Sequence, residues 1–352
     1  METILNIPFI KRLSNDIAID LGTRYCCVSS DASPQKHSEA SYVAYDTNAK
    51  RIIAIGDKAK KMLGRTPPNI KVLSPIKNGI TGNMEMSGIL IEYMVRHVKC
   101  SGLIKPRFMA AVPEDSSEVE RRSVLESLRL AGARIVYLIQ QTIAAGIGAD
   151  IPILEANGGI IADLGATSAR IAVVSLGGIV EIKKTNSGGI AMSNAITNLL
   201  ANAHGMLVGE LTAEKIKIHL GSAIPPEQKT TMVAKGRDIR TGLPVSAELT
   251  TDEVYNALRP SLRDITDTIR SCIETTPHDL INDIIEKGVT ITGGVAHMRG
   301  LDRLITKVTG VKCKIAPEPS AAITNGMKKI MASPKLMKFF FENSTDRIGE
   351  MN

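Results

Sequence analysis

The sequence contains no tryptophan, and aromatic residues make up only 3% of its 352 residues. A core with so few aromatic rings must be built from aliphatic side chains and from methionine, of which the chain has 14. Hydrophobic residues account for 43% and charged residues for 22%, as in globular proteins. A wholly disordered chain is therefore excluded, and the length favours two lobes or one large α/β unit.

The five cysteines are an odd number and include no C-x-x-C pair. They indicate neither a zinc site nor a disulfide framework, which fits a reducing cytoplasm. The six histidines show no metal-ligand spacing. No stretch approaches the run of about 20 apolar residues that a membrane-spanning helix needs, and the N-terminus lacks a small-residue cleavage site. We therefore expect a protein that is neither exported nor integral to a membrane.

Lysine and arginine number 43 against 36 acidic residues, a formal net charge of +7. These basic residues are scattered among acidic ones and are not gathered into tracts with interleaved aromatic side chains. Nucleic-acid-binding surfaces depend on such clustering, so we expect no nucleic-acid partner. The surplus indicates a modest attraction to anionic surfaces or nucleotides.

The first 13 residues combine apolar side chains with a basic pair near their end. The apolar residues include Ile4, Leu5, Phe9 and Ile10, and the basic pair is Lys11 and Arg12. One interpretation is an interfacial membrane anchor, with apolar groups in lipid and cations at the headgroups. The other is a docking arm that packs on the body of the protein, and the sequence favours neither.

Strand-like and helix-like segments alternate along the chain, which is typical of an α/β fold. Ser117 and Glu120 have the spacing of a capping box, which predicts a helix that begins there and ends at Gly132. Residues 251–276 predict a long helix, preceded by a polar excursion over residues 222–250.

An internal repeat links the two halves of the chain. The stretches NDIAIDLGTRYCCVSS (15–30) and GIIADLGATSARIAVVS (159–175) both run apolar strand, Asp, Leu, Gly, small hydroxyl residues, apolar strand. A duplicated lobe that begins with a β-hairpin would produce this pattern. Two such hairpins facing each other could hold one ligand between two lobes.

The residues at the two turns suit a phosphate ligand. Backbone N–H groups and neighbouring hydroxyls can point at phosphate oxygens, and an Asp before the glycine can hold Mg²⁺ through water. The candidates are Asp20, Gly22 and Thr23 in the first hairpin, and Asp163, Gly165, Thr167 and Ser168 in the second. A single turn of this kind with no ligand is the plain alternative, but two at matching places favour a binding site.

A third candidate is the pair Gly293 and Gly294, between the strand-like VTIT and a following helix. A nucleotide can lie against bare backbone at such a helix N-terminus. The alternative is a tight strand-to-helix turn without a ligand.

The order of these motifs, two glycine hairpins followed by a double-glycine turn, resembles the actin/Hsp70/sugar-kinase ATPase superfamily. The sequence between the motifs resembles the MreB family of bacterial actins. The resemblance spans about residues 15–330. The stretches that carry it include IDLGT (19–23), GDKAKKMLGRTP (56–67), VGELTAEKIKIHLGSA (208–223), KGRDIRTGLP (235–244) and DIIEKGVTITGG (283–294).

The resemblance implies an actin-like α/β fold, with two duplicated RNase H-like lobes and four subdomains around a nucleotide cleft. It implies lobe I at residues 14–147 and 311–334, with a small subdomain at about 31–74. Lobe II would cover residues 148–310, with a small subdomain at about 185–255. Residues 1–13 would be an apolar N-terminal segment and residues 335–352 a C-terminal tail.

The resemblance also implies a site for ATP and Mg²⁺. By position, Thr23 would contact phosphate, Gly165, Ala166, Thr167 and Ser168 would form the second loop, and Asp20 and Asp163 would flank the metal. Glu214 and Lys217 would lie near the ribose and adenine, and Gly293 and Gly294 would back the nucleotide.

The family likeness further implies head-to-tail filaments at the inner face of the cell membrane, with a role in cell shape or cell-wall synthesis. Possible partners are a conventional MreB paralogue and membrane proteins of cell-wall synthesis. Leu103 and Ile104, flanked by basic residues, would then contact lipid, whereas the plain alternative is a buried lead-in to a strand.

This sequence departs from the family pattern mainly at positions that the resemblance places around the nucleotide. MreB proteins usually read D-I-G-G-G-T-T-E in the second loop, whereas this chain reads DLGATSAR (163–170). Side chains at Ala166 and Thr167 raise the cost of any positive φ, and Arg170 replaces an acid by a cation. Tyr25 adds bulk to the first loop. Carboxylates are also absent at four further places: Asn78, Asn83, Ile190 and Ser193.

The catalytic position is changed as well. YLIQQTIAAGIGA (137–149) stands where the family reads L-I-E-E-P-M-A-A-A-I-G, so Gln141 replaces the glutamate that would act on the attacking water. A neutral amide cannot be a general base but can orient water, as the glutamine of actins does. We therefore expect ATP binding with weak hydrolysis.

Two other hypotheses stay open. The chain could be a degenerate pseudo-ATPase that co-assembles with or regulates a conventional MreB, or that positions an organelle or plasmid. A non-filament enzyme such as a sugar kinase is the third, and no substrate-base signature supports it. The tail carries Phe339, Phe340 and Phe341, which predict either a patch packed on the body or a partner-binding segment.

Overall fold

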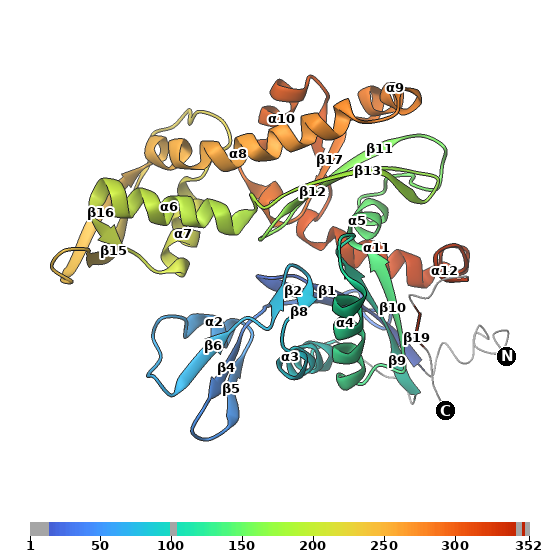
Figure 1. The fold of residues 1–352 in the computed structure, drawn as a ribbon, viewed down its shortest axis with the longest axis horizontal. Coiled ribbons are helices and arrows are strands. Elements are labelled where there is room, and N and C mark those ends of the chain that lie inside the picture. The colour runs from blue at the N-terminus through green and yellow to red at the C-terminus, as the bar shows by residue number, and fades with distance from the viewer. Residues whose placement is uncertain (1–13, 99–103, 343–346, 349–352) are drawn as a thin grey trace. The chain divides into compact units, whose positions relative to one another are not determined.

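A computed structural model describes residues 14–98, 104–342 and 347–348 (Figure 1). The chain forms two compact units: unit 1 is residues 1–151 with 321–352, and unit 2 is residues 152–320. We expected residues 311–334 in the first lobe. The structure instead groups residues up to 320 with unit 2, because the short strand β18 (Cys313–Ile315) pairs there with β17 (Val289–Thr292).

Unit 1 is built on one mixed sheet with the strand order β19-β10-β9-β1-β2-β3. Its strands are β1 (Ser14–Leu21), β2 (Tyr25–Ser30), β3 (Lys36–Ala40), β9 (Ile104–Val112), β10 (Ile135–Gln140) and β19 (Arg347–Ile348). Strands β1 to β3 are antiparallel neighbours, whereas β9 and β10 run parallel to β1. The parallel strands are joined by a helical crossover, as parallel pairing requires.

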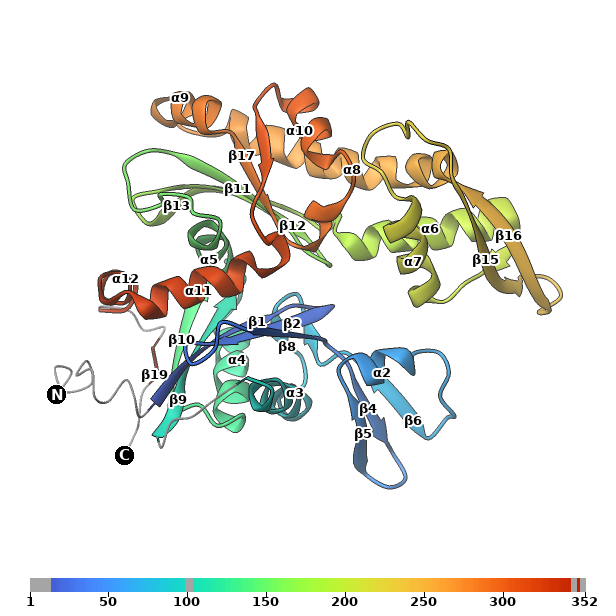
Figure 2. The same cartoon turned by 180° about the vertical axis from the view of Figure 1, so that it is seen from behind.

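Helices cover both faces of this sheet. The helices are α3 (Met84–Arg96), α4 (Glu118–Leu130), α5 (Gln141–Gly148) and α11 (Ala322–Ala332). Alternate residues of β1, such as Ile17 and Ile19, share a buried core with α3 and α4, and α11 packs against β1 and α5 (Figure 2). The predicted capping box of α4 is confirmed, since Ser117 and Glu120 bond to each other's backbone N–H.

A small sheet and two short hairpin strands extend unit 1. They comprise β4 (Val43–Asp46), β5 (Arg51–Ile55), β6 (Ile70–Leu73), the helix α2 (Asp57–Lys61), and the pair β7 (Ile76–Lys77) and β8 (Ile80–Thr81). Their core is small, formed mainly by Ala40, Tyr42, Ala44 and Ala59.

Unit 2 repeats the architecture of unit 1. Its sheet has the order β13-β12-β11-β17-β18, with β11 (Gly159–Leu164), β12 (Ala169–Ser175) and β13 (Gly178–Thr185) antiparallel. β17 and β18 run parallel to β11, so the order and the directions match β3-β2-β1-β9-β10 of unit 1. The duplication predicted from the two hairpin sequences is thus confirmed.

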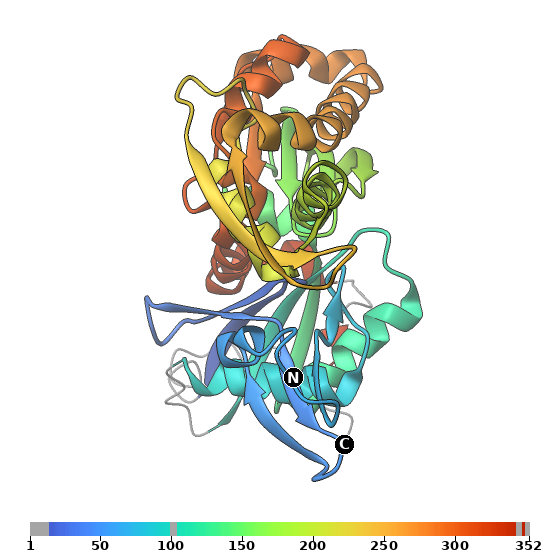
Figure 3. The same ribbon diagram turned by 90° about the vertical axis from the view of Figure 1, so that its left-hand side faces the viewer.

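The helices of unit 2 pack on this sheet and on a three-stranded extension. They are α6 (Gly189–His204), α7 (Glu210–Leu220), α8 (Thr251–Glu274), α9 (His278–Lys287) and α10 (Leu301–Thr309), with short 3₁₀ turns η2 (Gly294–His297) and η3 (Pro319–Ala321). The extension is β14 (Met206–Leu207), β15 (Thr231–Asp238) and β16 (Pro244–Thr250). The polar excursion at 222–250 is therefore largely a β-hairpin, drawn yellow in Figure 3.

The C-terminal segment packs on unit 1 through the helix α12 (Pro334–Phe341). Phe341 is 5% exposed and its ring centroid lies 5.0 Å from that of Tyr137, whereas Phe339 is 54% exposed. Beyond the helix, β19 pairs with the edge strand β10. One phenylalanine of the tail is thus a core residue, and one is left on the surface.

Candidate functional site

The first glycine hairpin joins β1 to β2 in unit 1. A Cβ at Gly22 would lie 2.2 Å from the carbonyl oxygen of Tyr25, so only glycine fits there. The Gly22 carbonyl accepts a 2.6 Å hydrogen bond from the Ser41 hydroxyl. Asp20, near the end of β1, is only half-buried. The backbone of this loop is therefore held by close contacts, while the carboxylate of Asp20 beside it keeps contact with solvent.

The turn between β7 and β8 supports this loop. The backbone N–H of Asn78 donates to the Thr23 hydroxyl oxygen at 2.9 Å, with Asn78 in a left-handed conformation at φ 53°. A Cβ on the next residue, Gly79, would lie 3.8 Å from Oε1 of Gln141 and 3.3 Å from the ring of Pro113. The turn therefore lies beside Thr23 and Gln141, two of the predicted site residues.

A carboxylate that the sequence analysis did not single out lies at the start of α5. Oε1 of Glu114 accepts hydrogen bonds from the backbone N–H and from the hydroxyl of Thr142, both at 2.7 Å. Thr142 is the second residue of the helix that begins at Gln141, so Glu114 caps that helix. Because 28 residues separate Glu114 from Thr142, no local sequence motif could have signalled this contact.

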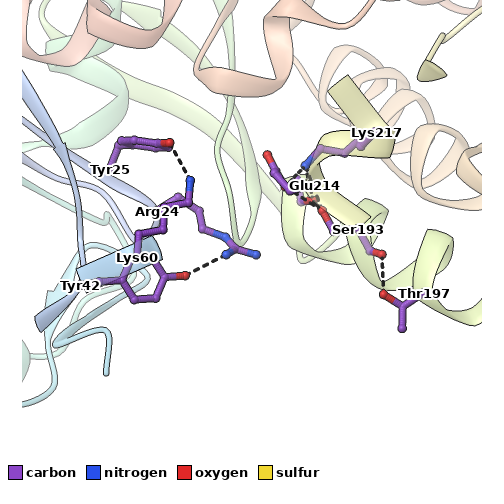
Figure 4. A network of polar contacts seen from close by, with 9 residues as sticks. Arg24, Tyr25, Tyr42, Lys60, Ser193, Thr197, Glu214 and Lys217 are labelled. Carbon is purple, nitrogen blue, oxygen red and sulfur yellow. Dashed lines mark hydrogen bonds and ion pairs between the residues drawn. The ribbon is translucent and has the colours of Figure 1, made fainter. Parts of the chain in front are cut away.

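Tyr25 follows the first loop, and its side chain is held by α2. Its hydroxyl accepts from Nζ of Lys60 at 2.6 Å, and the same Nζ lies 4.5 Å from the ring centroid. The neighbouring Arg24 donates to the Tyr42 hydroxyl at 2.8 Å (Figure 4). Both contacts tie the first loop to the smaller part of unit 1.

The second glycine hairpin, residues 165–168, is closed by a 3.0 Å hydrogen bond from the Gly165 N–H to the Ser168 carbonyl. None of Gly165, Ala166 and Thr167 has a positive φ, so the cost that side chains at Ala166 and Thr167 would add to such a conformation does not arise. The first N–H groups of α6 donate to this loop instead of to a side-chain cap. Gly189 donates to the Gly165 carbonyl at 3.1 Å and Ile190 to the Ala166 carbonyl at 2.7 Å.

Charged groups are buried at the base of this second loop. Asp163 on β11 is 2% exposed and Arg170 on β12 is 4% exposed, and the two are directly opposite in the antiparallel ladder. Oδ1 of Asp163 accepts from the Thr292 hydroxyl at 3.0 Å. Nη1 of Arg170 donates to the Ser168 hydroxyl oxygen at 2.9 Å. The two loops therefore differ in charge, since Asp20 of the first is half-exposed and Asp163 is buried opposite a cation.

The double-glycine turn packs directly on the second loop. Gly293 has φ 85°, and a Cβ there would lie 2.4 Å from the Leu164 carbonyl oxygen. Its N–H donates to the Pro319 carbonyl at 2.8 Å. Gly294 is exposed and opens a four-residue 3₁₀ turn, so the helix expected directly after the glycines begins only at Leu301.

Glu214 and Lys217 form one polar cluster on α7 with Ser193 of α6 (Figure 4). Nζ of Lys217 donates to Oε2 of Glu214 and to the Gly189 carbonyl, both at 2.7 Å. The Ser193 hydroxyl donates to Oε2 of Glu214 at 2.8 Å. Because Gly189 also bonds to Gly165, this cluster is connected to the second loop within unit 2.

The sequence matches the family described as MreB/Mbl protein over residues 14–338. The cell shape-determining protein MreB of Escherichia coli (strain K12) is 35% identical over 324 residues, which cover 90% of this chain and 93% of that protein. The chain belongs to the MreB/Mbl family.

Solved structures agree with this assignment. MreB5 of Spiroplasma citri bound to AMPPNP has a TM-score of 0.87 and 27% identity, covering 94% of this chain and 98% of that one. The MamK double helical filament has a TM-score of 0.75 at 18% identity, over 91% of this chain and 99% of that one, and shows the fold alone. The predicted actin-like α/β fold is confirmed.

Most of the residues predicted to contact lipid lie outside the described residues, namely Ile4, Leu5, Phe9, Ile10 and Leu103. Ile104, at the start of β9, is 36% exposed. In the part of the chain that the structure describes, no helix is both long and apolar enough to cross a membrane. Within the same residues, no group of three or more His, Cys, Asp or Glu side chains could hold a metal ion.

Proposed function

We propose that this chain is a bacterial actin-like cytoskeletal protein that binds ATP and assembles into membrane-associated filaments, which organise cell shape and cell-wall synthesis. Its membership of the MreB/Mbl family supports this proposal, as does the cell shape-determining role named for the Escherichia coli relative. MreB5 of Spiroplasma citri has been solved with ADP and with AMPPNP, which supports a nucleotide as the ligand.

The observation that carries the proposal is the repeated glycine hairpin, which follows the first strand of the same sheet in each unit. The Thr23 hydroxyl accepts from a backbone N–H and the Ser168 hydroxyl accepts from Arg170. A hydroxyl whose oxygen accepts in this way can still donate its hydrogen to a phosphate oxygen. We assign phosphate binding to Thr23 and to the loop of Gly165, Ala166, Thr167 and Ser168.

The remaining part of the nucleotide fits the polar cluster and the double-glycine turn of unit 2. Glu214 can accept from ribose hydroxyls, and Lys217 is held beside it with its side chain 11% exposed. Gly294 offers exposed backbone next to the packed Gly293. We assign these four residues to the ribose, the base and the backing of the nucleotide.

Mg²⁺ would accompany ATP, and the two predicted metal residues fit it unequally. Asp20 is a half-exposed carboxylate at a strand end, a suitable hard oxygen donor for a water-bound Mg²⁺. Asp163 is 2% exposed, accepts from Thr292 and faces Arg170, so it does not fit a cation. When bound, Mg²⁺ would neutralise phosphate charge, and we assign its protein contact to Asp20.

We infer that ATP hydrolysis is slow in this chain. Gln141 begins α5 with its Oε1 beside the β7–β8 turn, where it can accept a hydrogen from water but cannot remove a proton. Glu114 holds the first turn of this helix through Thr142. The attacking water is thus oriented without a general base at position 141.

The subdomain division extends this proposal. We assign the small sheet of unit 1 to a subdomain at about 31–74 and the β14–β16 sheet of unit 2 to a subdomain at about 185–255. Self-assembly is the main partner interaction that we propose. A conventional MreB and membrane proteins of cell-wall synthesis are further proposed partners at the inner face of the cell membrane.

Phosphate release and light scattering, measured on the purified chain with ATP, test the proposed activity. We expect nucleotide-dependent assembly with slow release of phosphate, and faster release from Gln141→Glu because a carboxylate can accept the proton. Rapid turnover by the unaltered chain would contradict slow hydrolysis. Filaments that form equally without nucleotide would instead favour a paralogue in which nucleotide is not used.

Co-sedimentation with liposomes tests the membrane contact. Removing residues 1–12 and replacing Leu103 and Ile104 with serine should weaken binding, because both changes remove apolar groups that could enter lipid. The matched control replaces Leu176 with serine, an apolar residue of unit 2 that is 65% exposed. Unchanged binding of the doubly altered chain would refute both anchors.

A further inference from the structure

The helix α5 begins at Gln141, the residue proposed to orient the attacking water. Among the described residues, Gln140 before it makes no side-chain cap hydrogen bond. The first N–H groups of a helix have no partner within the helix and depend on acceptors from elsewhere. Here the acceptor is Oε1 of Glu114, which lies 2.7 Å from both the backbone nitrogen and the hydroxyl oxygen of Thr142. The start of α5 is thus held by a distant carboxylate.

The contact between Glu114 and Thr142 is suited to fix this helix end. Thr142 is fully buried, so water competes poorly for its N–H and its hydroxyl. A carboxylate at a helix N-terminus is stabilised by the helix dipole, and its hydrogen bonds are stronger than those of a neutral acceptor. Loss of the carboxylate would therefore release the first turn of α5, which includes Gln141.

The segment that carries Glu114 also contacts the turn that lies beside Gln141. The ring of Pro113 lies 3.3 Å from the position that a Cβ on Gly79 would take, and Oε1 of Gln141 lies 3.8 Å from the same position. The β7–β8 turn donates a backbone N–H to the Thr23 hydroxyl at 2.9 Å. All of these residues belong to unit 1. Glu114 is therefore part of the packing that places Gln141 next to the first phosphate loop.

We propose that Glu114 is a positioning residue for ATP hydrolysis. Through Thr142 it fixes the start of α5, and with it the side chain of Gln141 that orients the attacking water. The proposal rests on the proposed function, since it concerns the same reaction. In this role Glu114 acts only through Gln141, so its loss should slow the chemical step and leave the affinity for nucleotide unchanged.

Single-turnover release of labelled phosphate from ATP, with calorimetric titration of AMPPNP, tests the proposal on the whole chain. Glu114→Ala should slow release about tenfold, because a small displacement of a group that orients a reactant costs a large factor in rate. Its affinity for AMPPNP should stay within about twofold of the parent. Glu114→Gln keeps an oxygen acceptor and should slow release less than about threefold. Glu120→Ala is the matched control, since it removes the glutamate that caps α4 and should leave the rate unchanged.

A double-mutant cycle separates this role from a purely structural one. In a Gln141→Ala background, Glu114→Ala should slow release by less than about twofold, because the effects of residues that act through each other are not additive. The same tenfold loss in both backgrounds would overturn the proposal. An unchanged rate in a folded Glu114→Ala variant would overturn it as well.

Thermal unfolding must show that Glu114→Ala is folded. If it is not, Thr142→Val replaces it, because valine has nearly the shape of threonine but lacks the hydroxyl that donates to Glu114. This variant should slow release about threefold, and again only when Gln141 is present. AMPPNP binding with no change of rate in these variants would overturn the proposal and leave the proposed function intact. No AMPPNP binding by the unaltered chain would overturn both.

Discussion

The two glycine hairpins share one backbone arrangement but differ in the contacts that support them and in the surroundings of their aspartates. The first is supported by a β-turn that donates to Thr23 and by the Ser41 hydroxyl on Gly22. The second is supported by the start of α6, whose N–H groups donate to the carbonyls of Gly165 and Ala166. Asp20 of the first is half-exposed, whereas Asp163 of the second is buried opposite Arg170.

The comparison shows that the two units share their backbone arrangement, whereas the side chains at the hairpins differ. The strand order and hairpin position depend on backbone pairing and on alternating apolar residues, and these are equal in the two units. The charge at the strand end depends on single side chains, which can change without disturbing the ladder. The two hairpins therefore keep one backbone plan but place their aspartates in different surroundings, half-buried for Asp20 and buried opposite Arg170 for Asp163.

The largest effect should come from removing the two aspartates one at a time. Asp163→Ala leaves Arg170 as an uncompensated buried charge and should lower the free energy of unfolding by about 3–5 kcal/mol. Asp20→Ala removes a half-exposed carboxylate and should cost less than about 1 kcal/mol. Urea unfolding followed by circular dichroism measures both. Equal losses would show that the two acids are equivalent after all.

Alanine at the two loop glycines should sharpen the comparison. A Cβ at Gly22 would lie 2.2 Å from the Tyr25 carbonyl oxygen, whereas at Gly165 it would lie 3.2 Å from the Ser168 carbonyl oxygen. We expect Gly22→Ala to cost about 2–3 kcal/mol and Gly165→Ala less than about 1 kcal/mol, because only the first forces the backbone apart. Thermal unfolding of both variants checks the order, and a reversal would mean that the first loop relaxes more easily.

The helices next to the site should respond differently to loss of a side chain. Glu114→Ala removes the acceptor for two donors of Thr142 and should cost about 1–2 kcal/mol. Glu114→Gln keeps an oxygen acceptor and serves as the control, with a smaller loss. α6 has no side-chain cap, since its N–H groups bond to the loop backbone. If both Glu114 variants were as stable as the parent, α5 would not depend on this cap.

The smallest effect should appear as a pH dependence that differs between the units. His37 stacks on His97 with ring centroids 4.5 Å apart, and burial together with the His97 charge lowers the pKa of His37 below 6.5. The unfolded chain then binds the proton more readily, so stability is full at higher pH and falls as pH drops through about 6.5.

In unit 2, burial raises the pKa of Glu253, but the hydrogen bonds from Thr250 and the interaction with His204 outweigh burial. The pKa of Glu253 is therefore lowered below 4.5. This contribution to stability is present above 4.5 and is lost only as pH falls further. Hydrogen exchange between pH 7.5 and 5 should therefore show weakening in unit 1 first, and His97→Gln should reduce it. Simultaneous weakening of both units would contradict the assignment.

Local patterns in the sequence predicted much of the fold. The capping box of Ser117 with Glu120, the helix at 251–276 and the repeated hairpins all depend on neighbours in the chain, and the structure shows each of them. The strands in 222–250 were missed although Val245, Ala247 and Leu249 alternate with polar residues, because the stretch as a whole is polar and mostly exposed.

The candidate site was only partly predictable for a related reason. Within each hairpin the glycine, the hydroxyl residues and the acid are adjacent in sequence, so their location at one turn could be predicted directly. The backbone conformation at Ala166 and Thr167 could not be predicted from residue type, and the loop closes without positive φ. Glu114 could not be found at all, since its partner Thr142 follows only after a helix and a strand.

The sequence by itself determined the family, the duplicated α/β plan and the identity of the loop residues, because these depend on short-range pattern and residue type. Only the tertiary structure decided that Asp163 is buried opposite Arg170, that Glu114 caps α5 and that the start of α6 supports the second loop. Burial depends on which segments pack around a side chain, and the contact of Glu114 with Thr142 joins segments far apart in the sequence, so no local pattern encodes them.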